Sequence, residues 1–169
     1  MNKIWNTYEK IIAGFLIILG VLVLTIIILA INLKVQSIIG QPEYSINDIS
    51  FYKLIKTYYH QILTAILGIS SGFMLLRTSR IGWIMSVSTF LIYGIGTIVN
   101  ILLKKYEGVR ISELNSELFF VLLIAFLFLT LAISLTNKQF RIKYLPNRKS
   151  WLAIGIISMT FMIDLMINR

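Results

Sequence analysis

Residues 58–103 read YYHQILTAILGISSGFMLLRTSRIGWIMSVSTFLIYGIGTIVNILL, and this stretch decides the fold. It contains two apolar segments, 58–76 and 81–103, separated only by the four residues RTSR. About 20 apolar residues in a helix span the hydrocarbon core of a bilayer, and both segments come close to or exceed that length. Because a four-residue connection cannot carry the chain back across a membrane, the stretch predicts two antiparallel transmembrane helices packed as neighbours.

Three further apolar segments flank this pair. They comprise residues 11–33, 118–135 and 151–167. The whole chain of 169 residues is 57% hydrophobic and only 14% charged, with mean hydropathy +0.84. Soluble domains average about 45–50% apolar and about 25% charged residues, so the apolar excess cannot be hidden in one small core. The sequence therefore predicts an all-α, polytopic transmembrane bundle with five spans.

The chain is expected to form a single membrane domain, residues 1–169. The longest connections are an outer loop at 34–57 and a basic cytoplasmic loop at 136–150, both too short to fold as separate domains. The first segment exceeds the 7–15 apolar residues of a signal peptide, so we expect an uncleaved anchor. The last segment would be only about 26 Å long as a helix and contains Asp164. A four-span protein with a re-entrant or surface-lying C-terminal segment is therefore the alternative.

The distribution of charge predicts the orientation. One side of the predicted bundle carries nine basic residues and a single acid, Glu9, whereas the other carries seven basic residues and five acids. All three tryptophans also border the first side, as in an interfacial aromatic belt. Cytoplasmic segments of membrane proteins are enriched in Lys and Arg. We therefore expect a multi-pass protein of the cell membrane, with a cytoplasmic N-terminus and the C-terminus outside.

The net charge of +9 does not indicate nucleic acid as a partner, because the basic residues flank apolar segments. In that position they favour anionic lipid headgroups. The residues expected to face these lipids lie in the cytoplasmic loop: Lys138, Arg141, Lys143, Arg148 and Lys149.

Small residues predict which helices pack most closely. In lipid they mark the faces where helix backbones approach one another. The second segment carries Gly68 and Gly72, and the third has residues 82, 86, 89, 93, 96 and 100 in a heptad rhythm. The expected helix-packing residues are Gly68, Gly72, Gly82, Ser86, Thr89 and Gly96. The fourth segment, LFFVLLIAFLFLTLAISL, is uniformly bulky and is expected to be the most lipid-exposed helix.

The outer loop carries a pattern of its own. After Asn47, a possible helix N-cap, the apolar residues Ile49, Tyr52 and Ile55 recur every three positions. Lys53 and Lys56 lie between them. The pattern predicts a short amphipathic helix at the outer interface.

Composition excludes several chemistries. The chain has no cysteine and a single histidine, His60. This rules out thiolate catalysis, Cys-based metal sites and bis-histidine haem ligation within the chain. Neither a cofactor nor a catalytic constellation is expected, although the residues do not exclude an enzyme outright.

Asp164 is the only carboxylate within an apolar segment. Ionisable groups inside membranes are costly and often functional. In the predicted topology His60 and Asn100 come to the same outer depth. We therefore expect His60, Asn100 and Asp164 to form a polar cluster near the outer face, the alternative being that each is an interfacial residue satisfied by water.

These observations predict a small, non-enzymatic membrane protein that acts as a subunit or accessory of a larger membrane protein complex, or associates with itself. The main alternative is a small channel or transporter, which could act as a homo-oligomer, with a path lined by Ser86, Thr89, Tyr93 and Asn100. A lipid- or quinone-binding module is a lesser alternative.

Overall fold

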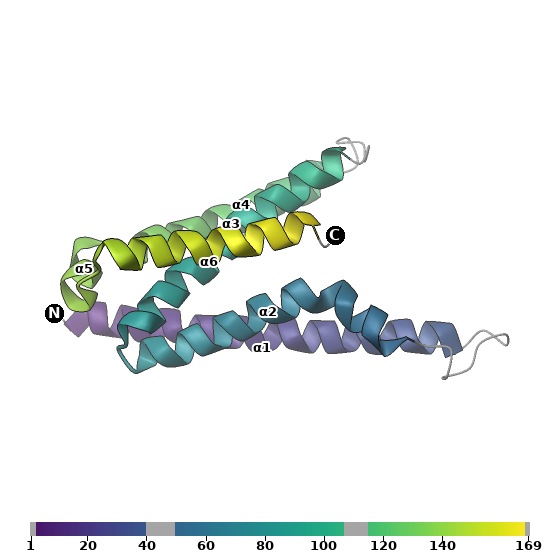
Figure 1. Cartoon of the computed structure of the whole chain (residues 1–169), viewed down its shortest axis with the longest axis horizontal. Helices are drawn as coiled ribbons and strands as arrows, with labels where there is room; N and C mark the ends of the chain where they lie inside the picture. Colours follow the sequence, from purple (N-terminus) through teal and green to yellow (C-terminus); the bar gives the residue numbers. More distant parts are fainter. Residues whose placement is uncertain (1–2, 40–49, 107–114, 168–169) are drawn as a thin grey trace.

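The computed structural model describes residues 3–39, 50–106 and 115–167, and these fold entirely into helices (Figure 1). The six helices are α1 (Lys3–Ile39), α2 (Phe51–Leu76), α3 (Arg80–Tyr106), α4 (Asn115–Leu135), α5 (Lys138–Tyr144) and α6 (Arg148–Ile167). All except α5 are long and apolar enough to cross a membrane. The prediction of five apolar helices is thus confirmed, and each begins before or extends beyond the predicted segment.

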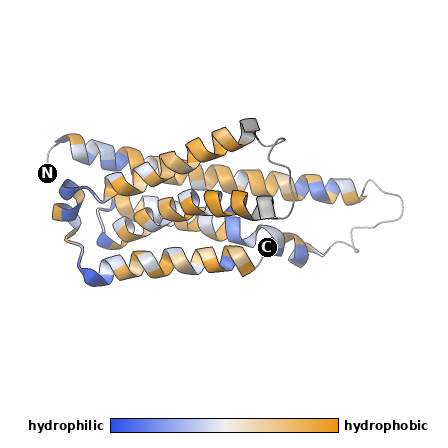
Figure 2. Ribbon diagram, turned by 90° about the horizontal axis from the view of Figure 1, so that it is seen from above, coloured by the Kyte–Doolittle hydropathy of each residue, from blue (hydrophilic) through white to orange (hydrophobic). Residues whose placement is uncertain are grey.

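Figure 2 shows why the helices outgrow the apolar segments. Hydrophobic residues fill the middle of the long helices, and hydrophilic residues lie at several of their ends, among them both ends of α1 and the start of α6. Helix α1 continues for 37 residues, well past the apolar segment 11–33. The backbone hydrogen bonds of a helix do not depend on side-chain polarity, so hydropathy predicts the apolar part of a helix better than its ends.

The long helices form two layers (Figure 1). Helix α1 packs along α2, while α4 and α6 both pack along α3. Helix α3 also contacts α2 and so connects the layers. The layers meet where α5 lies and diverge toward the opposite end. We call these the basic end and the far end, because exposed Lys and Arg side chains gather around α5.

The turn between α2 and α3 makes the two helices antiparallel, as the sequence predicts. Thr78 adopts a left-handed conformation with φ 53°, and the Ser79 hydroxyl accepts a hydrogen bond from the Gly82 amide at 2.9 Å. A Cβ atom at Gly82 would lie 2.4 Å from the Met74 carbonyl carbon. The close return of the chain therefore requires glycine at this position.

The closest helix contacts also involve α1 and α4, where the sequence pattern did not predict them. Gly20 of α1 lies against the backbone of Ala65, and Gly72 of α2 lies against that of Ala13. Gly94 of α3 packs on α4 at Ala125 and Leu129. The bulky segment 118–135, expected to be exposed to lipid, has one buried packing face, which includes Ala125, Phe128, Ala132 and Leu135. Helix α6, not α4, is the least buried of the long helices: 17% of the residues in its apolar 18-residue stretch are buried, against 22% in α4.

The prediction of a separate amphipathic helix is wrong, because residues 51–56 form the first part of α2. Helix α2 begins after Ser50, whose side chain accepts a hydrogen bond from the Lys53 amide. Asn47 and Ile49 lie outside the described residues. In this first part of α2, Leu54 is buried and Tyr52 and Ile55 are exposed.

The predicted basic loop 136–150 is largely helical. It holds α5, whose Phe140 and Tyr144 are buried, and the first residues of α6. Leu145 ends α5 in a left-handed conformation and is followed by Pro146, a common way to stop a helix. The Asn147 side chain then accepts a hydrogen bond from the Ser150 amide at 3.0 Å and so starts α6.

Candidate functional site

His60 and Asp164 meet at the far end of the molecule. Nδ1 of His60 lies 3.0 Å from Oδ2 of Asp164, and both side chains are mostly buried. The edge of the Phe161 ring packs against the imidazole at 5.8 Å between centroids. Tyr59 makes a side-chain hydrogen bond to the same carboxylate. Since a carboxylate only accepts hydrogen bonds, Nδ1 carries the proton in this pair and Nε2 is left for another partner.

Beside this pair is a cavity of about 260 Å³. Its walls come from four helices and include four apolar or glycine positions, Val23, Ile92, Gly96 and Leu165, and six polar residues, His60, Gln61, Thr64, Tyr93, Thr97 and Asn100. The cavity therefore lies between the two layers, on the side where they diverge.

The structure thus brings together two members of the predicted polar cluster and places the third in the same cavity wall. Asn100 lines the cavity together with His60, while Asp164 interacts with Nδ1 of His60 and does not itself line the cavity. Asn100 has an interaction partner of its own. The sequence pattern could locate these residues because helix lengths fix their depth.

The hydroxyl groups in the cavity wall differ in what they bind. Thr64 donates to the carbonyl of His60 at 2.8 Å, and Thr97 donates to that of Tyr93 at 2.6 Å. The Tyr93 hydroxyl is buried and has no hydrogen-bond partner in the described part of the chain. The Tyr93 ring is stacked on Phe128 with centroids 5.2 Å apart, which fixes its position.

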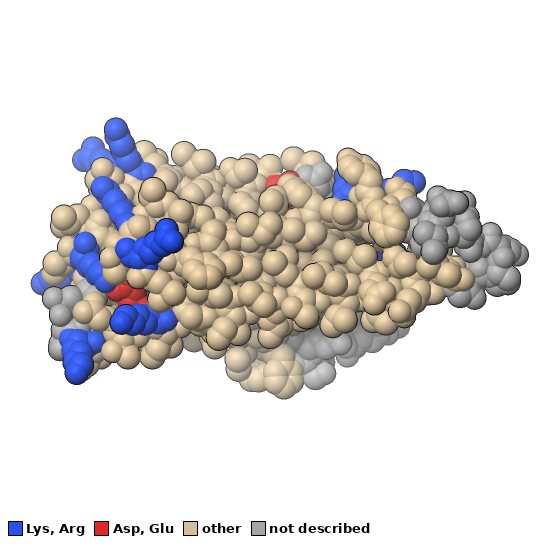
Figure 3. All heavy atoms as spheres, turned by 90° about the horizontal axis from the view of Figure 1, so that it is seen from below, with Lys and Arg blue, Asp and Glu red and all other residues tan. Residues whose placement is uncertain are grey.

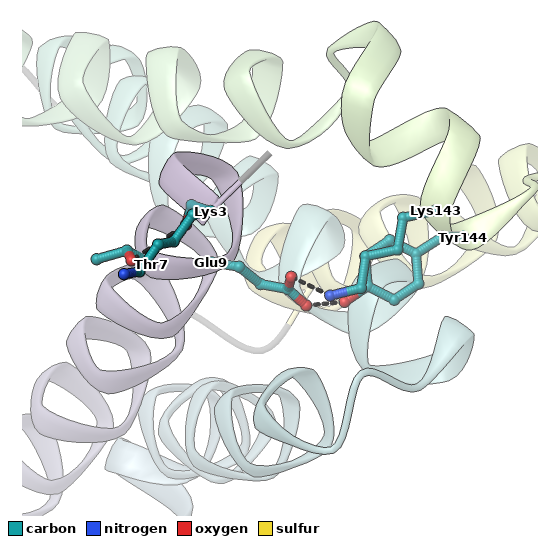
Figure 4. Close-up of polar contacts among 5 residues, drawn as sticks. All are labelled: Lys3, Thr7, Glu9, Lys143 and Tyr144. Carbon is teal, nitrogen blue, oxygen red and sulfur yellow. Dashed lines mark hydrogen bonds and ion pairs between the residues drawn. The ribbon is translucent and has the colours of Figure 1, made fainter. Parts of the chain in front are cut away.

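A second polar cluster closes the basic end (Figure 4). Glu9 of α1 is 3% exposed, and its carboxylate accepts hydrogen bonds from Lys143 and Tyr144 of α5. Burial and the hydrogen bond from its hydroxyl to Glu9 raise the pKa of Tyr144 above the usual 10.0. This cluster ties the start of the chain to the segment before α6.

Aromatic residues complete the closure of the basic end. The Trp83 indole is fully buried, donates to the Leu135 carbonyl at 2.7 Å and stacks on Tyr144. The Tyr8 hydroxyl donates to Ser134 at 2.8 Å. Trp83 therefore belongs to the core of this end, in contrast to the interfacial belt expected for all three tryptophans.

Glu9 and Tyr144 are the residues that sequence reasoning missed as partners. Glu9 stood out only as the single acid among nine basic residues on its side. That was a usable signal, since a lone carboxylate in a basic region often pairs with a cation. Its partner could not be chosen from the sequence, because Lys143 is one of several basic residues in segment 136–150.

Exposed Lys and Arg side chains make the surface of the basic end strongly cationic (Figure 3). Of the expected lipid-facing residues, Lys138, Arg141, Arg148 and Lys149 are exposed. Lys143 is only half-exposed and is engaged by Glu9. Further exposed cations come from α1 and the α2–α3 turn: Lys3, Lys10, Arg77 and Arg80.

The predicted helix-packing residues are divided among several contacts. Gly68 lies between Leu16 of α1 and Thr89 of α3, while Gly72 faces α1. Ser86 and Thr89 are completely buried, and the Ser86 hydroxyl approaches the Ser71 carbonyl of α2 at 3.5 Å. Gly96 faces Met162 and Leu165 of α6 instead of α2. The heptad seam of α3 therefore follows α2 only in its first half, because the layers diverge beyond it.

No family model, curated protein or solved structure matches this chain. Within the described residues, no group of three or more His, Asp or Glu side chains is placed to hold a metal ion.

Proposed function

We propose that this chain is a non-enzymatic, multi-pass membrane protein that acts as a subunit or accessory of a larger membrane protein complex. One observation carries the proposal: α1, α4 and α6 each pack extensively along a single neighbouring helix. In a self-contained bundle of five helices, most would have two such neighbours. The open sides suit transmembrane helices of another protein.

The far end is where the packing is most incomplete. Within the described residues, the last buried position of α1 is Ile27, and that of α6 is Ser158. Nearer the basic end, Gly14 of α1 and Gly155 of α6 also lie on open surface, with no neighbouring atom within 4 Å of a Cβ built on them. Since small residues mark helix contact faces in lipid, these two glycines are suited to a partner helix.

Extraction of the tagged full-length protein into native nanodiscs, followed by native mass spectrometry, tests this proposal. We expect a second membrane protein in a fixed ratio. Gly155→Leu should reduce its recovery, whereas Ile156→Leu, an exposed control on the same helix, should not. A photo-reactive side chain at Phe126 or Ile163 should form an adduct with the same protein. A chain that is alone in the nanodisc and forms no adduct would contradict the proposal.

The channel or transporter alternative has less support. The row of α3 residues expected to line a conduction path borders no open space in its first half, within the described part of the chain. There Ser86 and Thr89 are fully buried beside Trp83 and Phe90. Among the described residues, the only part of this row that lines an open space is its second half, at the cavity. Proteoliposomes that contain the purified protein and are loaded with a set of fluorescent small solutes would reveal flux if a path forms.

We further propose that the basic end is cytoplasmic, which places the N-terminus inside. The gathering of exposed cations at this end supports it (Figure 3). The chain has no cysteine, so single cysteines at Lys138 and Lys56 report each end without background. An impermeant maleimide added to intact cells should label only the second. Labelling of Lys138→Cys instead would reverse the orientation.

A further inference from the structure

We propose that the cavity between α1, α2, α3 and α6 binds a neutral, mainly apolar molecule through a carbonyl oxygen that accepts a hydrogen bond from the Tyr93 hydroxyl. This site is independent of the contact with a partner protein proposed above. Two sources share this chemistry: the head group of a quinone and the acyl ester of a lipid.

The size of the cavity limits what can enter. At about 260 Å³ it exceeds the ~30 Å³ that one water molecule occupies in the liquid and lies just below the roughly 300–1,000 Å³ of typical ligand pockets. It fits a single ring or one ester group with the first part of its chain. A whole lipid would extend out between the diverging layers.

The unsatisfied Tyr93 hydroxyl indicates the ligand's chemistry. A buried hydroxyl without a hydrogen bond is unfavourable, and the described part of the chain offers it no acceptor. Thr64 and Thr97, its neighbours in the wall, already donate to helix carbonyls. Tyr93 also lines the cavity and its ring is held by Phe128, so a carbonyl oxygen that reaches its hydroxyl would supply the missing acceptor.

The charges around the cavity favour a neutral ligand. Among the described residues, His60 is the only Lys, Arg, His, Asp or Glu residue in the wall, and Asp164 next to it provides the opposite charge when the imidazole is protonated. An anionic or cationic ligand would thus find no unpaired counter-ion in this part of the chain. Nε2 of His60 can donate to a carbonyl when protonated and accept from a hydroxyl when neutral. The apolar wall of Val23, Ile92 and Leu165 suits the body of the molecule.

Gly96 provides a way to fill the cavity. A Cβ atom at this position would lie 3.5 Å from Met162 and 3.9 Å from Leu165, which is ordinary contact. Gly96→Ala should therefore fold, and Ile95→Leu, at an exposed position next to it that does not line the cavity, should bind like the wild type. Gly96→Leu should project into the cavity and exclude a ligand. Tyr93→Phe should remove only the donor, without a change of shape.

The experiment uses the full-length protein in nanodiscs of a diether phospholipid, which has no ester carbonyl. In the first arm, duroquinone, a single-ring quinone, is titrated and its binding is followed by native mass spectrometry. In the second arm, a diester phosphatidylcholine replaces the quinone at low mole fraction. Thermal unfolding of every variant shows that it is folded.

We expect saturable binding of one molecule per chain in one of the two arms, and that arm identifies the source. Gly96→Leu should abolish binding and the control Ile95→Leu should retain it. Tyr93→Phe should weaken binding by a few-fold to about tenfold, the value of one hydrogen bond. Absence of binding in both arms would overturn the proposal, as would binding that Gly96→Leu leaves unchanged. Equal affinity of the wild type and Tyr93→Phe would overturn the role of the hydroxyl.

Discussion

His60 and Asp164 form the direct side-chain link between α2 and α6, with Nδ1 and Oδ2 3.0 Å apart. The two helices otherwise touch at few residues, because they belong to layers that diverge at this end. The side chains of His60 and Asp164 are 15% and 19% exposed. Because both side chains are largely shielded from solvent, their interaction is expected to help fix the position of α6 relative to α2.

The first prediction concerns the strength of this link. Exposed ion pairs contribute at most about 1 kcal/mol, and removal of one partner from a fully buried pair costs about 3–5 kcal/mol. For this partly buried pair we expect a coupling free energy of about 1–3 kcal/mol. A double-mutant cycle with His60→Ala and Asp164→Ala, read by unfolding of the reconstituted protein, measures it. Additive effects of the two substitutions would show that the link contributes nothing.

The second prediction concerns Tyr144 and alkaline pH. Burial and Glu9 raise the pKa of Tyr144 in the folded protein above the 10.0 of the unfolded chain. The stabilisation is therefore complete below pH 10 and is lost as the pH rises above it, because the unfolded chain then ionises more readily. The free energy of unfolding should fall more steeply between pH 9 and pH 11 in the wild type than in Tyr144→Phe. Identical slopes for the two proteins would contradict this.

The third prediction distinguishes the glycines by their surroundings. A Cβ at Gly82 or Gly72 would lie 2.4 Å or 2.7 Å from backbone atoms of a neighbouring helix. Gly82→Ala and Gly72→Ala should each destabilise the protein by about 1–3 kcal/mol through overpacking. Gly14→Ala, where a Cβ meets open space, should leave stability unchanged or raise it by up to about 1 kcal/mol. Chemical unfolding compares them, and an equal loss for all three variants would refute the assigned contacts.

The fourth prediction concerns anionic lipid. Basic residues near a membrane surface contribute about 1 kcal/mol each to the attraction of anionic headgroups. Neutralising Lys138, Arg141, Arg148 and Lys149 with Gln should reduce the enrichment of phosphatidylglycerol around the protein, which native mass spectrometry of mixed-lipid nanodiscs can quantify. Gln at the exposed far-end lysines Lys34, Lys53 and Lys56 provides the control. A comparable loss in the control set would show that the basic end has no special role.

The sequence predicted the helices well and their neighbours less well. Hydropathy located every long helix, and the RTSR connection determined that α2 and α3 are adjacent. Gly68 and Gly72 were predicted as packing residues without a partner helix, and the structure places Gly68 between α1 and α3 and Gly72 against Ala13 of α1. A small residue indicates that some backbone comes close. Which one depends on helix rotation and crossing, and these arise from all contacts together.

The two polar clusters also differ in how well they could be predicted from the sequence. Counting residues from the ends of their helices placed His60 and Asp164 at the same depth in the membrane. Both also stood out as rare residue types: the only histidine of the chain and the only carboxylate in an apolar segment. Glu9 could not be matched with Tyr144, because the segment 136–150 was interpreted as a loop. Only the fold of α5 places Phe140 and Tyr144 inward and turns a basic connection into part of the core.

The burial of Glu9 has a consequence for how the protein is made. Its partner Lys143 is 134 residues further along the chain. At about 5–20 residues per second of synthesis, that separation corresponds to roughly 7–27 s. Throughout this interval, while α1 to α4 are being made, the carboxylate of Glu9 must stay in contact with water or another cation. The basic end can therefore close only after α1 to α4 have been made, and the His60–Asp164 contact at the far end can form only later still.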